Sequence, residues 1–445
     1  MKKTTYILAC LICLILLRVD SRAEMVLTVE DVRARSLQFN RTYLASIEDV
    51  ARADAEITRR RAGAFPTVDI TSSYNRNLKL PSFFVNIEDE PDPVEFKTGF
   101  KNSFGAALNV RQSLWHGGKV FTAISIARIY KKYADSQAER VASEIEYNAD
   151  LLFYSAILEK TRLDVLQAAF ETNSYNLKMV EKLFSQGLVS EYEVLRARVE
   201  KSNLQPQILE VESSARLAEK RLKSFLGIDL DEPVVLVEVE TEPALPTMLS
   251  SEAMTDSALA HRPEMKMAEY NAEMNKKAIQ IARGDYFPSL DAVSNYSWQS
   301  QSDRMTLTDN QAESWSVGLA LTIPIFHGGS RSGEVRDRRA AYQQSRLALA
   351  QYRDDVTLEV EAAYDQIIQA RKALDIQGET IAQGEEGLRI ANLRYETGIG
   401  TQLEVLSAQT ALTTARQMMA TARFNYLRAK SQMKKATTID ISIGS

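Results

Sequence analysis

The 445-residue sequence predicts a mixed α and β membrane protein that is internally duplicated. Three observations lead to this fold class. Long stretches carry the heptad periodicity of packed helices, four shorter stretches alternate between apolar and polar residues, and both patterns recur in the second half of the chain. We therefore expect strands that contribute to a β-barrel and long helices that form a wall continuous with it.

The first 23 residues have the pattern of a bacterial secretory signal. Two lysines precede an apolar run from Tyr6 to Leu17, and small residues precede an expected cleavage after Ala23. The run is too short to span a bilayer as a helix. Both cysteines, Cys10 and Cys13, lie in this segment, which excludes disulfides and cysteine chemistry from the mature chain. A lipid-anchored Cys10 is the alternative reading of the segment.

The chain is acidic, with a formal net charge of −5 that becomes more negative once the basic signal is removed. An acidic protein without a basic cluster is a poor candidate for binding nucleic acid. Beyond the signal, no apolar run in the sequence reaches the length of a transmembrane helix. We therefore expect any membrane crossing to consist of strands.

Short sequences recur at a fixed distance along the chain. The stretch "FSQGLVSEYEVL" at 184–195 returns as "YETGIGTQLEVL" at 395–406, and "LWHGGKV" returns as "IFHGGSR", both 211 residues later. This spacing indicates a duplication. The divisions that we expect are a first structural repeat at 24–227, a Pro-rich acidic connector at 228–257, a second repeat at 258–437 and a C-terminal tail at 438–445.

Each repeat contains one predicted β-hairpin, at 66–115 and at 288–326. Alternation over long strands is typical of a membrane barrel, although a strand of a soluble sandwich shows it too. The Pro-rich, acidic stretch "LKLPSFFVNIEDEPDPVEFK" between the first two strands is expected to be an exposed loop. The apolar residues that alternate with small and polar ones in the last strand are Trp315, Val317, Leu319, Leu321, Ile323 and Ile325.

Four strands are too few to close a barrel, for which about eight is the practical minimum. Backbone groups in lipid cannot stay unpaired, so several chains must pool their strands if these strands lie in a membrane. Three chains would supply twelve strands. We therefore expect a barrel that pools the four strands of each of several chains, of which a trimeric 12-stranded β-barrel is one example.

Long helices are predicted at 119–184 and 330–395, and returning helices at 190–226 and 401–437. The first long helix contains no proline and carries two heptad seams. A helix with two seams contacts neighbours on both sides, which lets several helices enclose a space as a cylinder. A solid helical bundle is the alternative.

A glycine turn joins each long helix to its returning helix. Gly187 and Gly398 are placed to adopt the left-handed conformation that ends many helices. Ser190 and Thr401 can then cap the returning helices, with acidic residues in the first turn. The recurring sequence is thus explained by one helix-to-helix turn in each repeat.

The motifs resemble those of one family over nearly the whole mature chain. Their order and spacing are similar to those of the TolC-type outer-membrane efflux and secretion channels. The matching stretches are "LTVEDVRARSLQFN" at 27–40, "RRAGAFPTVDI" at 60–70, "FLGID" at 225–229, "ALAHRPEM" at 258–265, "ARGDYFPSLDAVSNYSW" at 282–298 and "LALTIPIFHGGSRSGEV" at 319–335.

The resemblance implies a trimer whose barrel crosses the outer membrane of a Gram-negative bacterium and continues as a long 12-helix α-barrel through the periplasm. The connector would form a small mixed equatorial region. The implied role is a passive exit duct for efflux or type I secretion, opened at its periplasmic tip. Its implied partners are outer-membrane lipid, a periplasmic adaptor and an inner-membrane pump of the RND, MFS or ABC type. A non-conducting, periplasm-spanning structural or docking protein is the alternative.

The same resemblance implies roles for residues of both glycine turns. In the family, acidic residues after the second turn ring the closed constriction, and Glu404 matches one of them. The other acidic position holds Ser407, and Gly400 stands where a family member has an arginine of a polar latch. We expect these three residues at the constriction. The residues expected at the periplasmic tip, in contact with the adaptor, are Gly187, Leu188, Ser190, Glu193, Gly398 and Thr401.

We expect no catalytic activity, no cofactor and no metal site. The sequence contains no nucleophile elbow, phosphate-binding loop or metal-ligand spacing. Of the three histidines, His116 and His327 occupy equivalent positions before Gly-Gly, and His261 precedes a predicted helix. His116 and His327 are therefore expected to be turn residues where strands meet helices.

Overall fold

The computed structural model of the chain describes residues 25–86, 93–237 and 250–438. The predicted signal at 1–23 and nearly all of the C-terminal tail lie outside these ranges. The described chain forms two compact units, each of which takes segments from both halves. The helical unit comprises the described parts of Met1–Ile47, Gln137–Met265 and Arg353–Ser445, and the sheet unit those of Glu48–Ser136 and Lys266–Tyr352.

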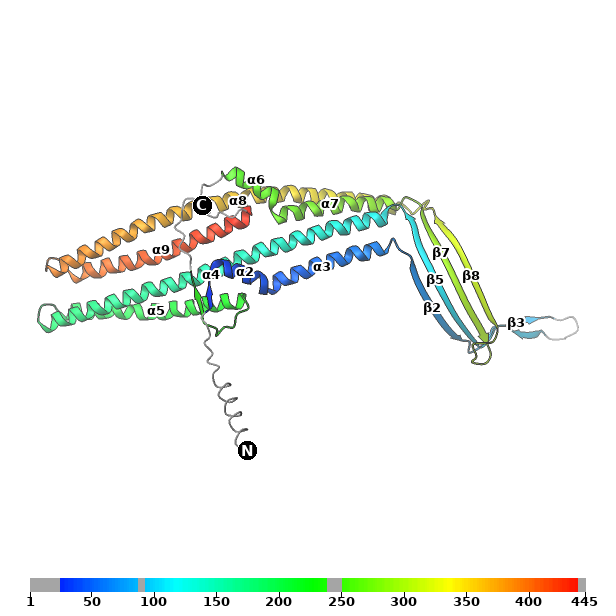
Figure 1. The fold of residues 1–445 in the computed structure, drawn as a ribbon, viewed down its shortest axis with the longest axis horizontal. Helices are drawn as coiled ribbons and strands as arrows, with labels where there is room; N and C mark the ends of the chain where they lie inside the picture. The colour runs from blue at the N-terminus through cyan, green and yellow to red at the C-terminus, as the bar shows by residue number, and fades with distance from the viewer. Residues whose placement is uncertain (1–24, 87–92, 238–249, 439–445) are drawn as a thin grey trace, which may run out of the picture. The chain divides into compact units, whose positions relative to one another are not determined.

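Four long antiparallel strands form one open sheet in the sheet unit (Figure 1). The strand order is β2-β5-β7-β8, so the pairing of β5 with β7 joins the two halves of the chain. β2 and β8 are the edge strands. The bounds are β2 (Thr67–Arg76), β5 (Asn102–His116), β7 (Ser289–Ser302) and β8 (Gln311–Thr322).

One face of this sheet is apolar and exposed. The register places Ile70, Leu108, Tyr296 and Trp315 side by side in one row across all four strands. Residues directly opposite one another in a ladder point to the same face. Trp315 is 75% exposed and Ile70 78% exposed, so this face lacks a covering layer within the described chain.

The opposite face of the sheet is polar. Asn295 donates a hydrogen bond from Nδ2 to Oδ1 of Asn109 at 2.7 Å. On the same strands, Arg111, two residues after Asn109, forms an ion pair at 2.8 Å with Asp291, four residues before Asn295. The sheet therefore has one apolar face and one polar face.

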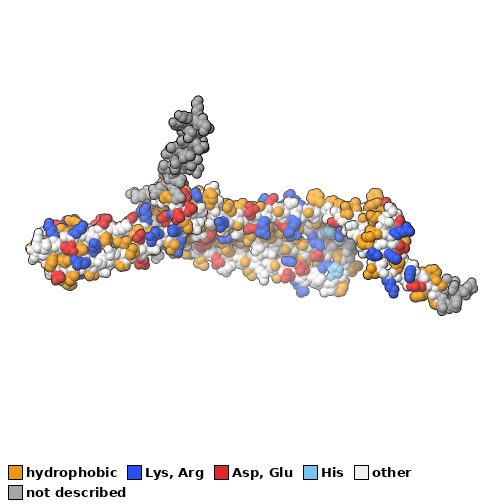
Figure 2. Space-filling model, turned by 90° about the horizontal axis from the view of Figure 1, so that it is seen from below, with side chains coloured by type: hydrophobic (Ala, Val, Ile, Leu, Met, Phe, Trp, Pro, Cys, Tyr) orange, Lys and Arg blue, Asp and Glu red, His pale blue; other side chains and the backbone are white. Residues whose placement is uncertain are grey.

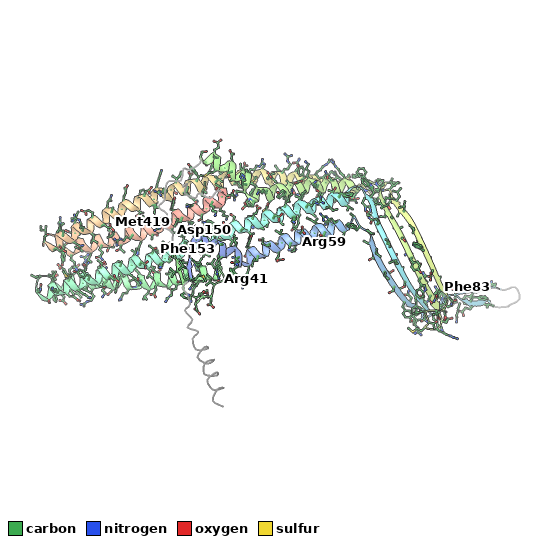
Figure 3. The ribbon with its side chains drawn as sticks, viewed as in Figure 1. Arg41, Arg59, Phe83, Asp150, Phe153 and Met419 are labelled. Atoms are coloured by element: carbon green, nitrogen blue, oxygen red, sulfur yellow. The ribbon has the colours of Figure 1, made fainter. Side chains whose placement is uncertain are left out.

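The structure corrects two expectations about the hairpins. β8 ends at Thr322, whereas the predicted strand ran to residue 326; Pro324 has no backbone N–H for a strand ladder. The expected exposed loop contains a short hairpin of β3 (Ser82–Val85) and β4 (Val94–Lys97). Phe83, labelled in Figure 3, stacks on Phe96 across this hairpin with ring centres 5.9 Å apart, which favours the pairing.

The helices recur in pairs of equal or nearly equal length. Elements of the second half follow their counterparts by 222 residues before the sheet and by 211 residues after it. α6 therefore begins the second repeat at Ser251, and the boundary predicted at 257/258 is wrong because it falls inside this helix. The pairs are α2 (Val29–Phe39) with α6 (Ser251–His261), α3 (Arg41–Ala62) with α7 (Pro263–Gly284), α4 (Lys119–Ser185) with α8 (Ser330–Glu396), and α5 (Glu191–Phe225) with α9 (Gln402–Thr437).

The described helices are amphipathic. Acidic and basic side chains are interspersed along them on the face shown in Figure 2. In the described ranges, every helix is either too short or too polar to serve as a transmembrane span.

One hydrophobic core of the helical unit lies where α2, α4 and the end of α5 meet. β1 (Met25–Leu27) pairs in parallel with β6 (Val234–Leu236) beside this core. The buried residues of the core are Leu27, Val32, Ala149, Phe153, Leu222, Leu226 and Ile228.

A buried carboxylate next to this core connects three helices (Figure 3). Asp150 of α4 has only 3% of its side chain exposed. It accepts hydrogen bonds from Nε and Nη2 of Arg33 in α2, at 2.6 and 2.7 Å, and from Oγ of Ser431 in α9 at 2.7 Å. Because a buried charge is costly unless it is paired, these bonds fix α2 and α9 against α4.

We expect Asp150→Ala to lower the free energy of unfolding of the detergent-solubilised protein by about 3 kcal/mol, because Arg33 and Ser431 lose this carboxylate while remaining partly or fully buried. Urea denaturation followed by circular dichroism measures the change. Asp49→Ala is the control, since Asp49 and its partner Arg52 are largely exposed and such pairs contribute about 1 kcal/mol or less. Equal losses in the two variants would contradict a special role for Asp150.

Candidate functional site

The two glycine turns lie in the helical unit and share one backbone geometry. Gly187 and Gly398 have φ values of +73° and +74°. The residues that follow them, Leu188 and Ile399, each donate a backbone hydrogen bond of 3.0 Å to the carbonyl five residues earlier. This is the Schellman motif, whose positive φ favours glycine.

The second turn folds more tightly onto its helix than the first. The N–H of Gly400 donates to the carbonyl of Arg394 at 2.8 Å. A Cβ added to Gly400 would lie 2.8 Å from Cβ of Arg394 and 3.0 Å from the backbone nitrogen of Tyr395. The corresponding residue of the first turn is Val189, which packs against a small apolar cluster of α4 and α5. Gly400 is therefore required by close backbone approach within the chain.

Glu404 has a partner within its own chain. Its Oε2 lies 3.3 Å from Nε of Arg394, with the two side chains about half exposed. The N–H of Glu404 donates to Oγ1 of Thr401 at 3.3 Å, so Thr401 caps α9. Glu404 thus connects the start of α9 to the end of α8.

Sequence reasoning missed Arg394. The pair depends on the fold-back at Gly400, which brings together side chains that lie ten positions apart in the sequence. Opposite charges flanking a glycine turn were the only available signal, and that signal is weak because most charged pairs around turns do not meet.

The first returning helix is capped differently. Ser190 occupies the position before α5, but its side chain makes no capping hydrogen bond, so the expectation that it caps this helix is wrong. Glu191 and Glu193 in the first turn still favour the helix through its dipole. The two turns are therefore equivalent in backbone geometry and different in side-chain chemistry.

Several polar atoms near the turns are buried without a hydrogen-bond partner among the described residues. They are Oε2 of Glu193, Oη of Tyr395, both amide atoms of Gln402 and Nε2 of Gln409. Burial, together with the nearby charge of Glu193, raises the pKa of the Tyr395 hydroxyl. Because buried polar groups are nearly always paired in folded proteins, these atoms need partners that the described part of one chain does not supply.

Two further predicted site residues, Leu188 and Ser407, are exposed. Leu188 is 68% exposed, and Ile399, which was not predicted, is 75% exposed at the equivalent position of the second turn. Ser407 is also exposed and lines a cleft with Arg196 and Glu200 of α5. The second turn thus gathers Gly400, Thr401 and Glu404 around Arg394, whereas Ser407 lies one helical turn further along α9.

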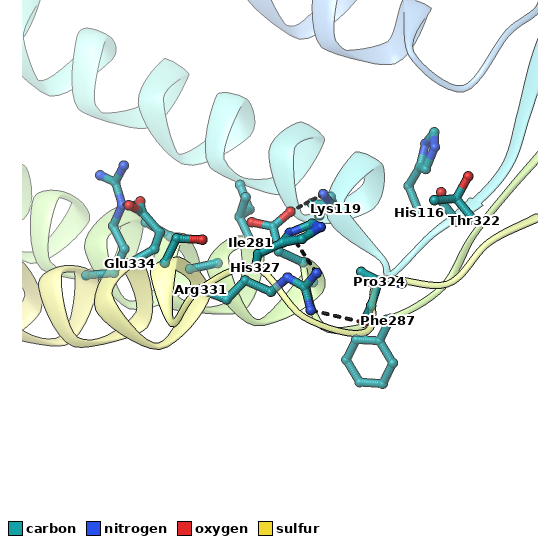
Figure 4. A pocket seen from close by; sticks show the side chains of 16 residues that line it. His116, Lys119, Ile281, Phe287, Thr322, Pro324, His327, Arg331 and Glu334 are labelled. Carbon is teal, nitrogen blue, oxygen red and sulfur yellow. Dashed lines mark hydrogen bonds and ion pairs between the residues drawn. The ribbon is translucent and has the colours of Figure 1, made fainter.

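A charged cleft lies in the sheet unit where strands meet long helices (Figure 4). His116 and His327 both line it. Nη2 of Arg331 lies 2.7 Å from Nδ1 of His327, and Lys119 forms an ion pair with Asp285. Within the described ranges, no three His, Cys, Asp or Glu side chains are grouped so that they could hold a metal ion.

We expect Gly400→Ala to destabilise the second turn by about 1–3 kcal/mol, because the added methyl group overlaps the backbone of α8. Thermal unfolding and limited proteolysis between residues 394 and 404 measure the effect. Gly387→Ala in α8 is the matched control: its added Cβ meets nothing within 4 Å, and alanine favours a helix by up to about 1 kcal/mol. A Gly400→Ala variant as stable as Gly387→Ala would show that the turn has room for a side chain.

Known proteins resemble the chain along both repeats. A family model described as outer membrane efflux protein matches residues 32–228 and 254–438. The outer membrane protein TolC of Vibrio cholerae is 20% identical over 382 residues, which cover 85% of this chain and 83% of TolC. The solvent efflux pump outer membrane protein SrpC of Pseudomonas putida is 23% identical over 414 residues, which cover 90% of this chain and 83% of SrpC.

The fold also resembles that of solved structures. CusC superimposes with a TM-score of 0.77 at 20% sequence identity, over 92% of this chain and 91% of CusC. At this identity the likeness concerns the fold alone.

Proposed function

The chain belongs to the outer membrane efflux protein family, and from that premise we propose that it works as a trimeric duct closed at its two glycine turns. It is an outer-membrane protein of the kind that serves efflux or type I secretion. The observation that carries the proposal is the open four-stranded sheet, which has an exposed apolar face and two edge strands without a partner in the described chain.

Three copies of the sheet close into a 12-stranded barrel, with β8 of one copy beside β2 of the next. Each backbone group left unpaired in lipid costs several kcal/mol, which makes pairing of both edges obligatory. The apolar face then meets lipid and the polar face lines the lumen. Four helices per chain adjoin the strands, α3 and α7 before β2 and β7 and α4 and α8 after β5 and β8, so twelve helices would continue the wall as an α-barrel.

Cysteine pairs across the proposed β2–β8 contact test the trimer. Thr71 and Ser316 lie on the polar face of the two edge strands, and both natural cysteines fall in the predicted signal. We expect Thr71→Cys/Ser316→Cys to give covalent dimers and trimers on mild oxidation, whereas each single variant stays monomeric on a denaturing gel. Parallel variants place the second cysteine at Ser314 or Gly318 instead of Ser316, so that three registers between copies are covered. No ladder in any of these combinations would rule out the proposed contact.

The second glycine turn holds the duct closed. The Arg394–Glu404 pair and the close approach of Gly400 fasten the start of α9 to the end of α8. Glu193, Tyr395 and Gln402 bring buried polar atoms without partners to the same end of the helical unit. Contacts between neighbouring copies would satisfy these atoms in the closed state, and opening would expose them to water.

The exposed tips of the turns dock the partner. Leu188 and Ile399 present apolar side chains at equivalent positions, so a trimer would carry six such tips. Exposed apolar side chains at the end of a polar assembly mark a protein contact. A periplasmic adaptor that couples the duct to an inner-membrane pump is the partner that fits this family.

We expect Arg394→Ala to raise the basal open probability of the reconstituted trimer in planar bilayers. The pair is half exposed and contributes about 1 kcal/mol at most, so the increase is limited to about fivefold. The charge swap Arg394→Glu/Glu404→Arg should return the open probability toward that of the wild type.

Arg389→Ala is the control for this measurement, because Arg389 pairs with Glu386 on the same helix face and does not bridge two helices. A swap variant as leaky as Arg394→Ala would remove the ion pair from the closing mechanism. An absence of pore current in every variant would favour the non-conducting docking protein.

A further inference from the structure

A cleft rich in arginine lies between the end of α7 and the start of α8. We call it the arginine cleft and define it by Arg283, Tyr286, Ser332, Val335, Arg336 and Arg339. All three arginines are exposed. None of their guanidinium groups forms a hydrogen bond or ion pair within the described part of the chain, although many other arginines of the protein do.

The charged cleft of Figure 4 opens on the polar face of the sheet. It is lined by Ser289 and Thr322, which pair where β7 and β8 reach the helices. It is also lined by His116, whose Nε2 lies 3.6 Å from Oδ1 of Asp291 on that face. The charged cleft therefore lies on the polar side of the sheet.

The arginine cleft is lined by a different side of α8 than the charged cleft. On α8 the charged cleft is lined by Arg331, Glu334 and Arg338, and at 3.6 residues per turn these project from a different side than Arg336 and Arg339. The arginine cleft therefore adjoins the apolar face of the sheet, at the end where β7 begins and β8 finishes.

We propose that the arginine cleft binds the headgroup of an anionic phospholipid at the periplasmic rim of the barrel. The proposal rests on the membrane barrel put forward above. If the apolar face lies in lipid, the cleft sits at the depth of the headgroups. Guanidinium groups bind phosphate oxygens through paired hydrogen bonds, and the amphipathic ring of Tyr286 suits the same depth.

The chemistry favours a lipid over a protein segment. Three unpaired positive charges call for an anion, and the adjoining surface is a sheet face whose exposed residues are apolar, including Leu319 and Leu321. A phospholipid matches both surfaces, because its phosphate would lie at the arginines and its acyl chains against the apolar face. The bound lipid would fix the height of the barrel in the membrane.

Lipid binding by the full-length trimer in detergent tests the proposal. Native mass spectrometry measures the binding of phosphatidylglycerol and of zwitterionic phosphatidylcholine. We expect the wild type to prefer phosphatidylglycerol, and Arg283→Ala/Arg336→Ala/Arg339→Ala to bind it about tenfold or more weakly, since each arginine near a membrane surface contributes about a fivefold factor. Arg52→Ala/Arg216→Ala/Arg389→Ala removes the same charge from exposed arginines elsewhere and should bind like the wild type.

Three outcomes would overturn the headgroup site: equal weakening in both triple variants, no preference for phosphatidylglycerol in the wild type, and displacement of the lipid by an equal concentration of inorganic phosphate. If the first triple variant does not assemble, lipid binding of the single variant Arg336→Gln is compared with that of the wild type instead. The cysteine cross-linking between β2 and β8 and the bilayer conductance report on the barrel separately. If the arginine triple variant forms an intact, conducting trimer and binds lipid as the wild type does, the headgroup site is contradicted and the proposed duct is not. If the wild type itself forms no trimer and carries no current, both proposals are contradicted.

Discussion

The two free edges of the β2-β5-β7-β8 sheet are the constraint on which the rest of the architecture depends. A strand edge in water can be hydrated, but a strand edge in a bilayer has only another strand as a partner. The exposed row of Ile70, Leu108, Tyr296 and Trp315 commits this sheet to an apolar environment. In the proposed trimer, edge pairing between copies would bring the helices next to the strands into one ring. A closed helical wall and a shared mouth would then follow from how the sheet is completed.

Within one chain, some buried polar groups have hydrogen-bond partners and others have none among the described residues. Asp150 is fully satisfied by Arg33 and Ser431, and this network sets the relation of three helices. Tyr395 and Gln402, by contrast, are buried without partners in the described chain. Buried polar groups without partners are costly, and contacts with neighbouring copies in the proposed trimer would satisfy them. Loss of those contacts would then allow the turn region to change.

The sequence was most informative where periodicity acts over many residues. The long helices and long strands lie where heptads and alternation predicted them, because each pattern is fixed by one face that must be buried. It was least informative where local signals compete. The segment holding β3 and β4 contains prolines and acids typical of a loop, yet Phe83 and Phe96 stack and pair it. The start of the second repeat was placed too late, since α6 follows a connector of similar composition.

The candidate site was predictable only in part. Gly187 and Gly398 have the backbone conformation expected from their position after long helices. The role of Gly400 and the partner of Glu404 depend on how closely the chain folds back on α8, which no pattern of residue types specifies. Ser190 matches the composition of a cap, but its side chain makes no capping bond. The sequence therefore predicted where the turns lie, whereas the side-chain contacts within them depend on the backbone geometry.

The equal length of α4 and α8, 67 residues each, restricts how such a chain can evolve. Inserting one residue into either helix would rotate everything beyond it by about 100° and lengthen it by about 1.5 Å relative to its counterpart. In the proposed trimer, one turn would then no longer match the other at the shared mouth. Changes in the length of the proposed duct would therefore have to occur in both repeats together, and in steps that preserve the heptad seams. A lineage that lengthens its periplasmic reach should carry paired insertions separated by the same interval that separates the repeats.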